Sequence, residues 1–126
     1  MSIMDVNLML RATAAGALNA NELTPASLDF GGPDQHPLTY VAIFPDLATG
    51  TTPTCNIVIQ ESDDNSNWRN ALSFAEASDA DTPTKKFVTG KLDGRYRRFT
   101  ATLVGAAADF GIVLIAPVIG GTYESF

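Results

Sequence analysis

The sequence predicts an all-β protein in which residues 1–126 form a single antiparallel β-sandwich domain. The chain length fits one domain with an ordinary hydrophobic core, because 45% of the residues are hydrophobic. Ten glycines and seven prolines divide the chain into many short segments. About eight of these segments show strand periodicity, with turn signals at roughly the 8–12-residue spacing that is typical of sandwiches and barrels.

The first half of the chain contains four segments with strand periodicity. Polar alternation predicts an edge strand at residues 6–11, while apolar residues on both faces of residues 38–44 predict a central strand. Residues 12–23 are rich in Ala and Asn but have no apolar stripe at helical spacing, so we expect a strand or an extended arm. The remaining strands are expected at 27–30 and 54–60, separated by loops at 31–37 and 45–53.

The second half contains the strongest turn signal. Asp93-Gly94 is typical of a two-residue hairpin, so the segments 85–92 and 95–104 are expected to pair across it. The nearly continuous apolar run 110–116 predicts a strand at the centre of a sheet or inside a sandwich. Residues 71–75 fit a strand poorly, and a short helical turn is the alternative. The ends of the chain are expected to form extended arms, at 1–5 and 120–126.

An acidic, amide-rich turn follows the strand predicted at 54–60. Asp and Asn side chains bond their own backbone and tolerate left-handed conformations, and Trp68 is expected to return the chain to the core. Alternate acidic and amide residues imitate the opening of a calcium loop, but Trp68 occupies the position that needs glycine and Phe74 the position that needs glutamate. We therefore predict a structural turn without metal, formed by Asp63, Asp64, Asn65, Asn67 and Trp68.

Charge is unevenly distributed along the chain. The net charge is -6, which argues against general binding of nucleic acid. Residues 1–68 contain eight acidic residues and one basic residue, whereas residues 69–98 contain seven basic and four acidic residues. The basic residues can simply protect exposed strand edges from unwanted pairing. One cysteine and one histidine leave no cluster for zinc, and no apolar run approaches the roughly 20 residues that span a bilayer.

The basic residues are densest in the strand predicted at 95–104. Alternation places Arg95 and Arg97 on one face and Arg98 on the other, so neither face offers a row of stacking groups for RNA bases. Guanidinium groups suit bidentate pairing with carboxylates of another protein. The predicted protein contacts are Arg95, Arg97, Arg98, Tyr123 and Phe126. No catalytic motif is present, so we expect neither enzymatic activity nor a cofactor.

Two segments carry a resemblance to a known family. The runs V-I-Q-E-S-D-D-N-S-N-W, ending at Trp68, and R-Y-R-R-F-T, starting at Arg95, resemble segments of the jelly-roll cement proteins on tailed-phage capsids, of the type found in a Bordetella podovirus. The resemblance implies a jelly roll, whereas the strand count equally admits an immunoglobulin-like Greek key. That second fold normally has a Cys pair, which this chain lacks.

The resemblance also implies a function. It implies a virion structural protein that is made in the host cytoplasm, lies on the outer capsid surface, and bridges subunits of the major capsid protein. We expect such a protein to be a homo-oligomer, a dimer or trimer, because several weak contacts then act together. The alternative is a carbohydrate- or receptor-binding β-sandwich module on a virion or cell surface, which exposed aromatic and acidic residues in one groove would favour.

Overall fold

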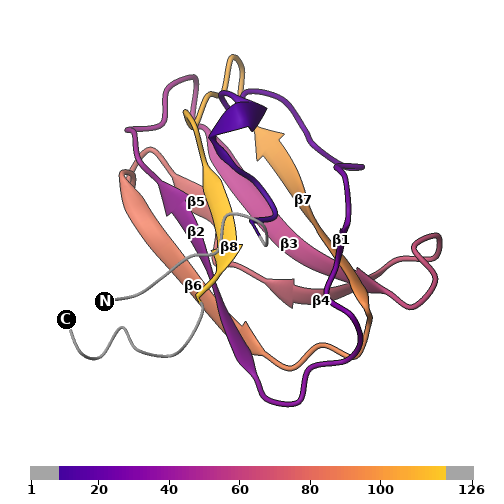
Figure 1. Ribbon diagram of the computed structural model, residues 1–126. Coiled ribbons are helices and arrows are strands. Elements are labelled where there is room, and N and C mark those ends of the chain that lie inside the picture. Colours follow the sequence, from indigo (N-terminus) through magenta and orange to yellow (C-terminus); the bar gives the residue numbers. More distant parts are fainter. Residues whose placement is uncertain (1–8, 119–126) are drawn as a thin grey trace.

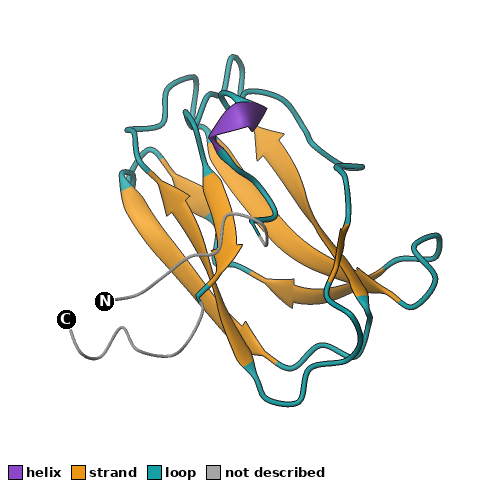
Figure 2. Cartoon of the chain, viewed as in Figure 1, coloured by secondary structure: helices purple, strands orange, loops and turns teal. Residues whose placement is uncertain are grey.

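The computed structural model describes residues 9–118, in which two antiparallel sheets pack face to face (Figures 1 and 2). The larger sheet has the order β1 (Leu28–Asp29), β7 (Tyr96–Val104), β3 (Thr54–Ser62) and β4 (Arg69–Ser73), and β5 (Ala77–Ser78) also pairs with β3. The smaller sheet has the order β6 (Thr84–Gly90), β2 (Leu38–Phe44) and β8 (Leu114–Pro117). The predicted antiparallel sandwich is confirmed.

Most connections cross from one sheet to the other. Only β3, β4 and β5 follow one another within the same sheet. The longest pairing joins β3 to β7, from Thr54 opposite Val104 to Ser62 opposite Tyr96. Both the jelly roll and the immunoglobulin-like Greek key use such crossing connections, so the preference for a jelly roll stays a prediction.

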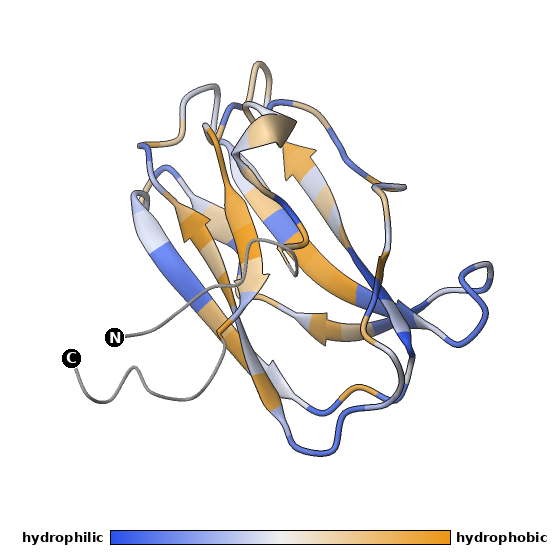
Figure 3. Ribbon diagram, viewed as in Figure 1, coloured by the Kyte–Doolittle hydropathy of each residue, from blue (hydrophilic) through white to orange (hydrophobic). Residues whose placement is uncertain are grey.

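The core lies between the sheets and is formed by apolar side chains at alternate strand positions. Figure 3 shows the hydrophobic stretches of the facing strands. Strand β3 supplies Cys55, Ile57 and Ile59, and β2 faces it with Tyr40 and Phe44. Each fully buried side chain of this size contributes roughly 1.5–3 kcal/mol to folding. The period-two pattern therefore identified these strands, and burial of the same alternate side chains holds the two sheets together.

The predicted hairpin at Asp93-Gly94 is wrong. Strands β6 and β7 belong to different sheets, and residues 91–95 cross between them. Side chains distant in sequence hold the crossing: the Leu92 N–H donates to Asp34, and the Asp93 N–H donates to Glu61, both at 3.0 Å. These contacts tie the crossing to the β1–β2 loop and to β3, where the local turn signal favours a hairpin.

The strand predicted at 110–116 begins only at Leu114, and it lies at the end of the strand order of the smaller sheet rather than at its centre. The preceding backbone instead bonds to the N-terminal arm, because the Phe110 N–H donates to the Leu18 carbonyl at 2.9 Å and the Leu18 N–H donates to the Gly111 carbonyl at 2.7 Å. Gly111 has φ 74°, a left-handed conformation that glycine adopts without steric cost. The Phe110 side chain still reaches the core, where its ring meets Phe44 edge to face.

Two segments of uncertain type are now assigned. Residues 69–73 form strand β4, so the helical-turn alternative for residues 71–75 is wrong. The segment 12–23 is an extended arm with one 3-10 turn, η2 (Thr13–Ala15), and Glu22 forms a bridge with Ala101. Of the strand predicted at 6–11, residues 6–8 lie outside the described residues, whereas Arg11 forms a bridge with Ile115 along the outer side of β8.

Candidate contact surface

The basic segment Arg95–Arg98 divides into one buried and two partly exposed arginines. The Arg97 side chain is 0% exposed and forms an ion pair with Asp34 at 2.8 Å. It also donates to the Tyr40 hydroxyl at 3.0 Å, and its guanidinium lies 4.4 Å from the centre of the Phe30 ring. The prediction that Arg97 contacts another protein is wrong, because alternation along β7 turns this residue into the sandwich.

The surroundings of Arg97 explain how a charge is tolerated there. A buried charge is costly unless it is paired and its hydrogen bonds are satisfied. Besides Asp34 and Tyr40, Arg97 donates to the carbonyl oxygens of Gly94 and Gly32. Burial also raises the pKa of the Tyr40 hydroxyl, which keeps it neutral as an acceptor for the arginine. Arg97 thus joins the loop between β1 and β2 to strand β7.

Arg95 and Arg98 lie nearer the surface. Arg95 makes a bidentate pair with Asp29, with both N–O distances 2.8 Å, and this arginine together with the Gly31 N–H lowers the pKa of Asp29 to about 2. Arg98 donates to the side-chain amide oxygen Oε1 of Gln60 at 2.8 Å, and its guanidinium lies 4.3 Å from the centre of the Trp68 ring. Asp29 and Gln60 thus fix the orientation of the two guanidinium groups, and a fixed orientation favours contacts with a specific geometry.

The acidic turn has the backbone bonding predicted for it. Asp64 accepts the N–H groups of Ser66 and Asn67 at 2.9 and 2.8 Å, and the Ser62 hydroxyl also donates to it. The donated hydrogen bonds hold the pKa of Asp64 well below its usual range. Asn65 has φ 62°, the left-handed conformation expected for such a turn.

The remaining residues of the turn have other partners. Asp63 pairs with Arg69, and the Asn67 amide donates to Asp64 at 2.8 Å. Trp68 is half-buried and stacks against Arg98 on the outside of the larger sheet, so the expectation that it enters the core is wrong. The Arg98 guanidinium is the group that holds it there.

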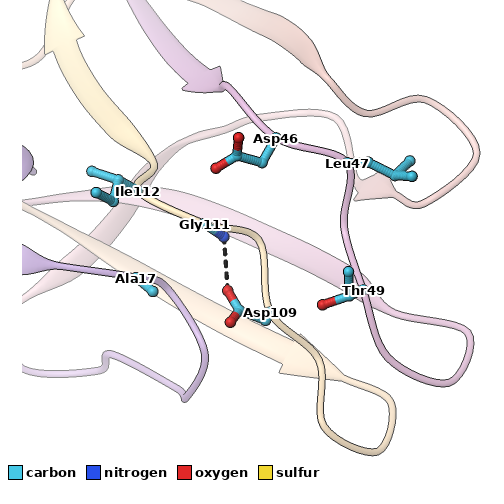
Figure 4. A pocket seen from close by; sticks show the side chains of 7 residues that line it. All are labelled: Ala17, Asp46, Leu47, Thr49, Asp109, Gly111 and Ile112. Atoms are coloured by element: carbon cyan, nitrogen blue, oxygen red, sulfur yellow. Dashed lines mark hydrogen bonds between the residues drawn. The ribbon is translucent and has the colours of Figure 1, made fainter.

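A second exposed surface lies at one end of the sandwich, which we call the loop end and define as residues 12–21, 45–53 and 105–113. Backbone bonds join these loops, including a bridge between Thr49 and Asp109. They surround an open depression of about 350 Å³, shown in Figure 4. Its lining residues are Ala17, Asp46, Leu47, Thr49, Asp109, Gly111 and Ile112.

The loop end combines apolar and acidic side chains. Leu47 is 59% exposed and Ile112 is 41% exposed, while Asp109 accepts the Gly111 N–H at 2.8 Å. Sequence reasoning missed this surface, because it assigned Ile112 to the strand predicted at 110–116 and Leu47 to an ordinary connecting loop. The only local signal was an apolar residue beside Asp46 in a loop rich in proline and threonine.

Sequence reasoning also missed a second buried arginine. The Arg11 side chain is 0% exposed, pairs with Glu22 through two bonds of 3.0 and 2.9 Å, and donates to the carbonyl oxygens of Gly16 and Val113. It fixes the N-terminal arm against the loop that precedes β8. Nothing near Arg11 in sequence indicates a buried pair, because its main partners lie 11 and 102 positions away.

The remaining predictions concern the C-terminal aromatic residues, metal binding and membrane spans. Tyr123 and Phe126 lie outside the described residues. Within residues 9–118, no group of three or more His, Cys, Asp or Glu side chains could hold a metal ion. No helix in that same range has the length and apolar character to cross a membrane.

Comparison with known proteins adds no assignment. None of the protein-family models compared with the chain matches it, and none of the curated proteins does either. The contacts described above therefore carry the functional argument.

Proposed function

We propose that this protein is a non-enzymatic virion structural protein that decorates and cements a phage capsid. In this proposal it folds as a jelly roll, lies on the outer capsid surface, and bridges neighbouring subunits of the major capsid protein. It is made in the host cytoplasm and acts as a homo-oligomer, with neither nucleic acid nor a membrane as partner.

One observation carries the proposal. The two segments that resemble capsid cement proteins are not independent in this fold, because Arg98 of the second donates to Gln60 of the first at 2.8 Å and stacks over Trp68, also of the first. Residues Gln60 and Arg98 are directly opposite in the pairing of β3 with β7. The outward-facing residues of the two runs thus lie side by side on the larger sheet, and this arrangement supports a shared binding role.

Two surfaces could supply the contacts to the capsid. Arg95, directly before β7, and Arg98 within it present charged groups that suit acidic patches on a partner. The loop end presents Leu47 and Ile112, whose exposure leaves apolar area for burial in an interface. A small domain that bridges subunits needs more than one such surface, because several modest contacts act together through avidity.

The alternative, a carbohydrate- or receptor-binding module, would be favoured by aromatic and acidic groups in one groove. The depression at the loop end has Asp46 and Asp109, but none of its described lining residues is aromatic. A sugar-binding site normally offers an aromatic face on which the ring stacks. We therefore retain the cement function as the proposal.

The test is co-sedimentation of the purified protein with capsid shells assembled without it, compared with binding to unassembled capsid subunits. We expect much tighter binding to shells, because the recognised surface exists only where several subunits meet. Equal binding to shells and free subunits, or no binding to shells, contradicts the proposal.

A further inference from the structure

Strand β6 forms an edge of the smaller sheet. Within the part of the chain that the structure describes, its seven residues pair with β2 only, from Thr84 opposite Phe44 to Gly90 opposite Leu38 (Figure 1). One side of its backbone ladder is therefore without a strand neighbour. Such an edge is a template for pairing with another strand.

The side chain at the centre of this edge is apolar and exposed. Phe87 is the fourth of the seven residues of β6 and is 59% exposed, on the outward face of the smaller sheet. The same face carries Lys85 and Thr89, and the Thr89 hydroxyl is hydrogen-bonded to Thr39 of β2 at 2.8 Å. A second, identical strand beside this edge would bury the exposed apolar surface of Phe87 against the Phe87 ring of the other copy.

We propose that two copies of this protein dimerise by antiparallel pairing of their β6 strands about a two-fold axis at Phe87. In this register Phe87 lies opposite its own copy, Lys86 opposite Val88, Lys85 opposite Thr89, and Thr84 opposite Gly90. The smaller sheets of the two copies then form one continuous sheet, and the two phenylalanine rings make a cross-strand aromatic pair.

The charges on β6 are compatible with this register. Lysine usually protects an edge strand from pairing, and β6 has two. Lys86 forms an ion pair with Asp81 of its own chain, so its charge is already compensated. Lys85 lies opposite Thr89 of the second copy, so the two exposed lysines do not oppose each other. A register shifted by one residue would place Lys85 opposite Val88 and move the phenylalanines apart.

The first experiment is disulfide trapping of the purified full chain with the Phe87→Cys variant. Directly opposite residues of an antiparallel pair have Cα atoms about 4.5–5.5 Å apart, which is within the range of a disulfide. The matched control is Val104→Cys, because Val104 is also 59% exposed but lies at the far end of β7. The native Cys55 is 1% exposed and does not compete.

Under mild oxidation we expect the Phe87→Cys variant to form covalent dimers at least roughly ten times faster than the Val104→Cys variant. Equal rates for the two variants overturn the proposal, because they indicate random collision. Circular dichroism of both variants verifies that each is folded, so a loss of structure is distinguished from a loss of pairing.

The second experiment tests the register by sedimentation velocity over a concentration series. Thr89→Lys places the new lysine opposite Lys85 of the second copy, and symmetry repeats this contact once more in the dimer. Because like charges directly opposite repel, we expect the dimer dissociation constant to rise roughly ten-fold. Adding Lys85→Glu to that variant replaces both repulsions by attractions and should restore dimerisation. A wild-type protein that stays monomeric at all concentrations, or a double variant as weak as the single one, overturns the proposal.

This inference names the interface for the homo-oligomer in the proposed function, but its experiments use the protein alone. Dimerisation without binding to shells would support the β6 pairing and contradict the cement function. Shell binding by a protein that stays monomeric would support the cement function and contradict the β6 pairing. The two proposals therefore fail separately.

Discussion

At the level of single residues, two arginines do structural work that sequence patterns assign to the surface. Arg97 and Arg11 are both 0% exposed in their side chains, and each joins segments distant in sequence through an ion pair and several carbonyl oxygens. Alternation along a strand assigns each residue to one of two faces, but it does not say which face points outward. Here the inward face of β7 receives one because Asp34 and Tyr40 are in place to accept its donors.

Replacing Arg97 by alanine should destabilise the fold severely. The change leaves Asp34, whose side chain is 9% exposed, without its charge partner, and removing one member of a buried ion pair typically costs roughly 3–5 kcal/mol. The matched control is Arg95→Ala in the same segment, which breaks an exposed pair with Asp29 and should cost far less. Urea denaturation followed by circular dichroism measures both, and similar midpoints for the two variants would contradict the assignment of Arg97.

Two exposed aspartates make stability depend on acid pH. The pKa of Asp29 is lowered to about 2 and that of Asp64 is lowered below its usual range, both from a reference of 3.8. A depressed carboxyl pKa stabilises the folded state above pH 3.8, and this contribution is lost as the pH falls toward 2. We expect Asp29→Asn to flatten the loss of thermal stability between pH 4 and 2. An unchanged slope in a melting series across this range would show that the Arg95 pair contributes nothing.

At the level of elements, period-two patterns predicted the long strands β2, β3 and β7, but the pairing of strands was predicted less well. The bounds expected at 38–44 are those of β2, and 54–60 and 95–104 each agree with the observed strand to within two residues. These strands bury alternate side chains, so their pattern is local. The partners of β6 and β7 depend on contacts of Asp34 and Glu61 with residues 92–93, and no local pattern contains that information.

The crossing between β6 and β7 should be sensitive to any side chain at Gly94. A Cβ there would lie 2.8 Å from both the Glu61 Cβ and the Ser62 backbone nitrogen, and the backbone has little room to move. We expect Gly94→Ala to cost roughly 1–3 kcal/mol of stability. Gly90→Ala is the control, because its Cβ would meet only the tip of the Leu72 side chain, which can adjust. Urea midpoints compare the two; a larger loss at Gly90 would contradict this account.

At the scale of the whole molecule, the candidate contact surface differs from the one expected from sequence. The basic strand is less available than its three arginines suggest, because one is buried and the other two already have partners in the chain. The exposed apolar residues at the loop end come from two loops, and only the fold brings Leu47 and Ile112 to one depression. Sequence could not predict that surface, because it depends on the bridge between Thr49 and Asp109.

The two surfaces should contribute to shell binding in different ways. Removing both exposed arginines, with Arg95→Ala and Arg98→Ala, should weaken binding to shells and reduce its salt dependence, because these contacts are electrostatic. The charge-matched control combines Lys85→Ala and Lys91→Ala, which removes two other exposed positive charges. Arg97 is left intact in both variants, and circular dichroism verifies that each is folded.

A loop-end variant completes the comparison. Combining Leu47→Ser with Ile112→Ser should weaken shell binding at every salt concentration, because these changes remove exposed apolar area and leave the net charge unchanged. Co-sedimentation with undecorated shells between roughly 50 and 500 mM salt separates the two effects, since screening acts mainly on exposed charges. If the arginine variant and its charge-matched control lose the same affinity, net charge alone attracts the protein to the shell. If the loop-end variant binds shells with wild-type affinity, the loop end does not contact the shell, and binding is limited to the surface around Arg95 and Arg98.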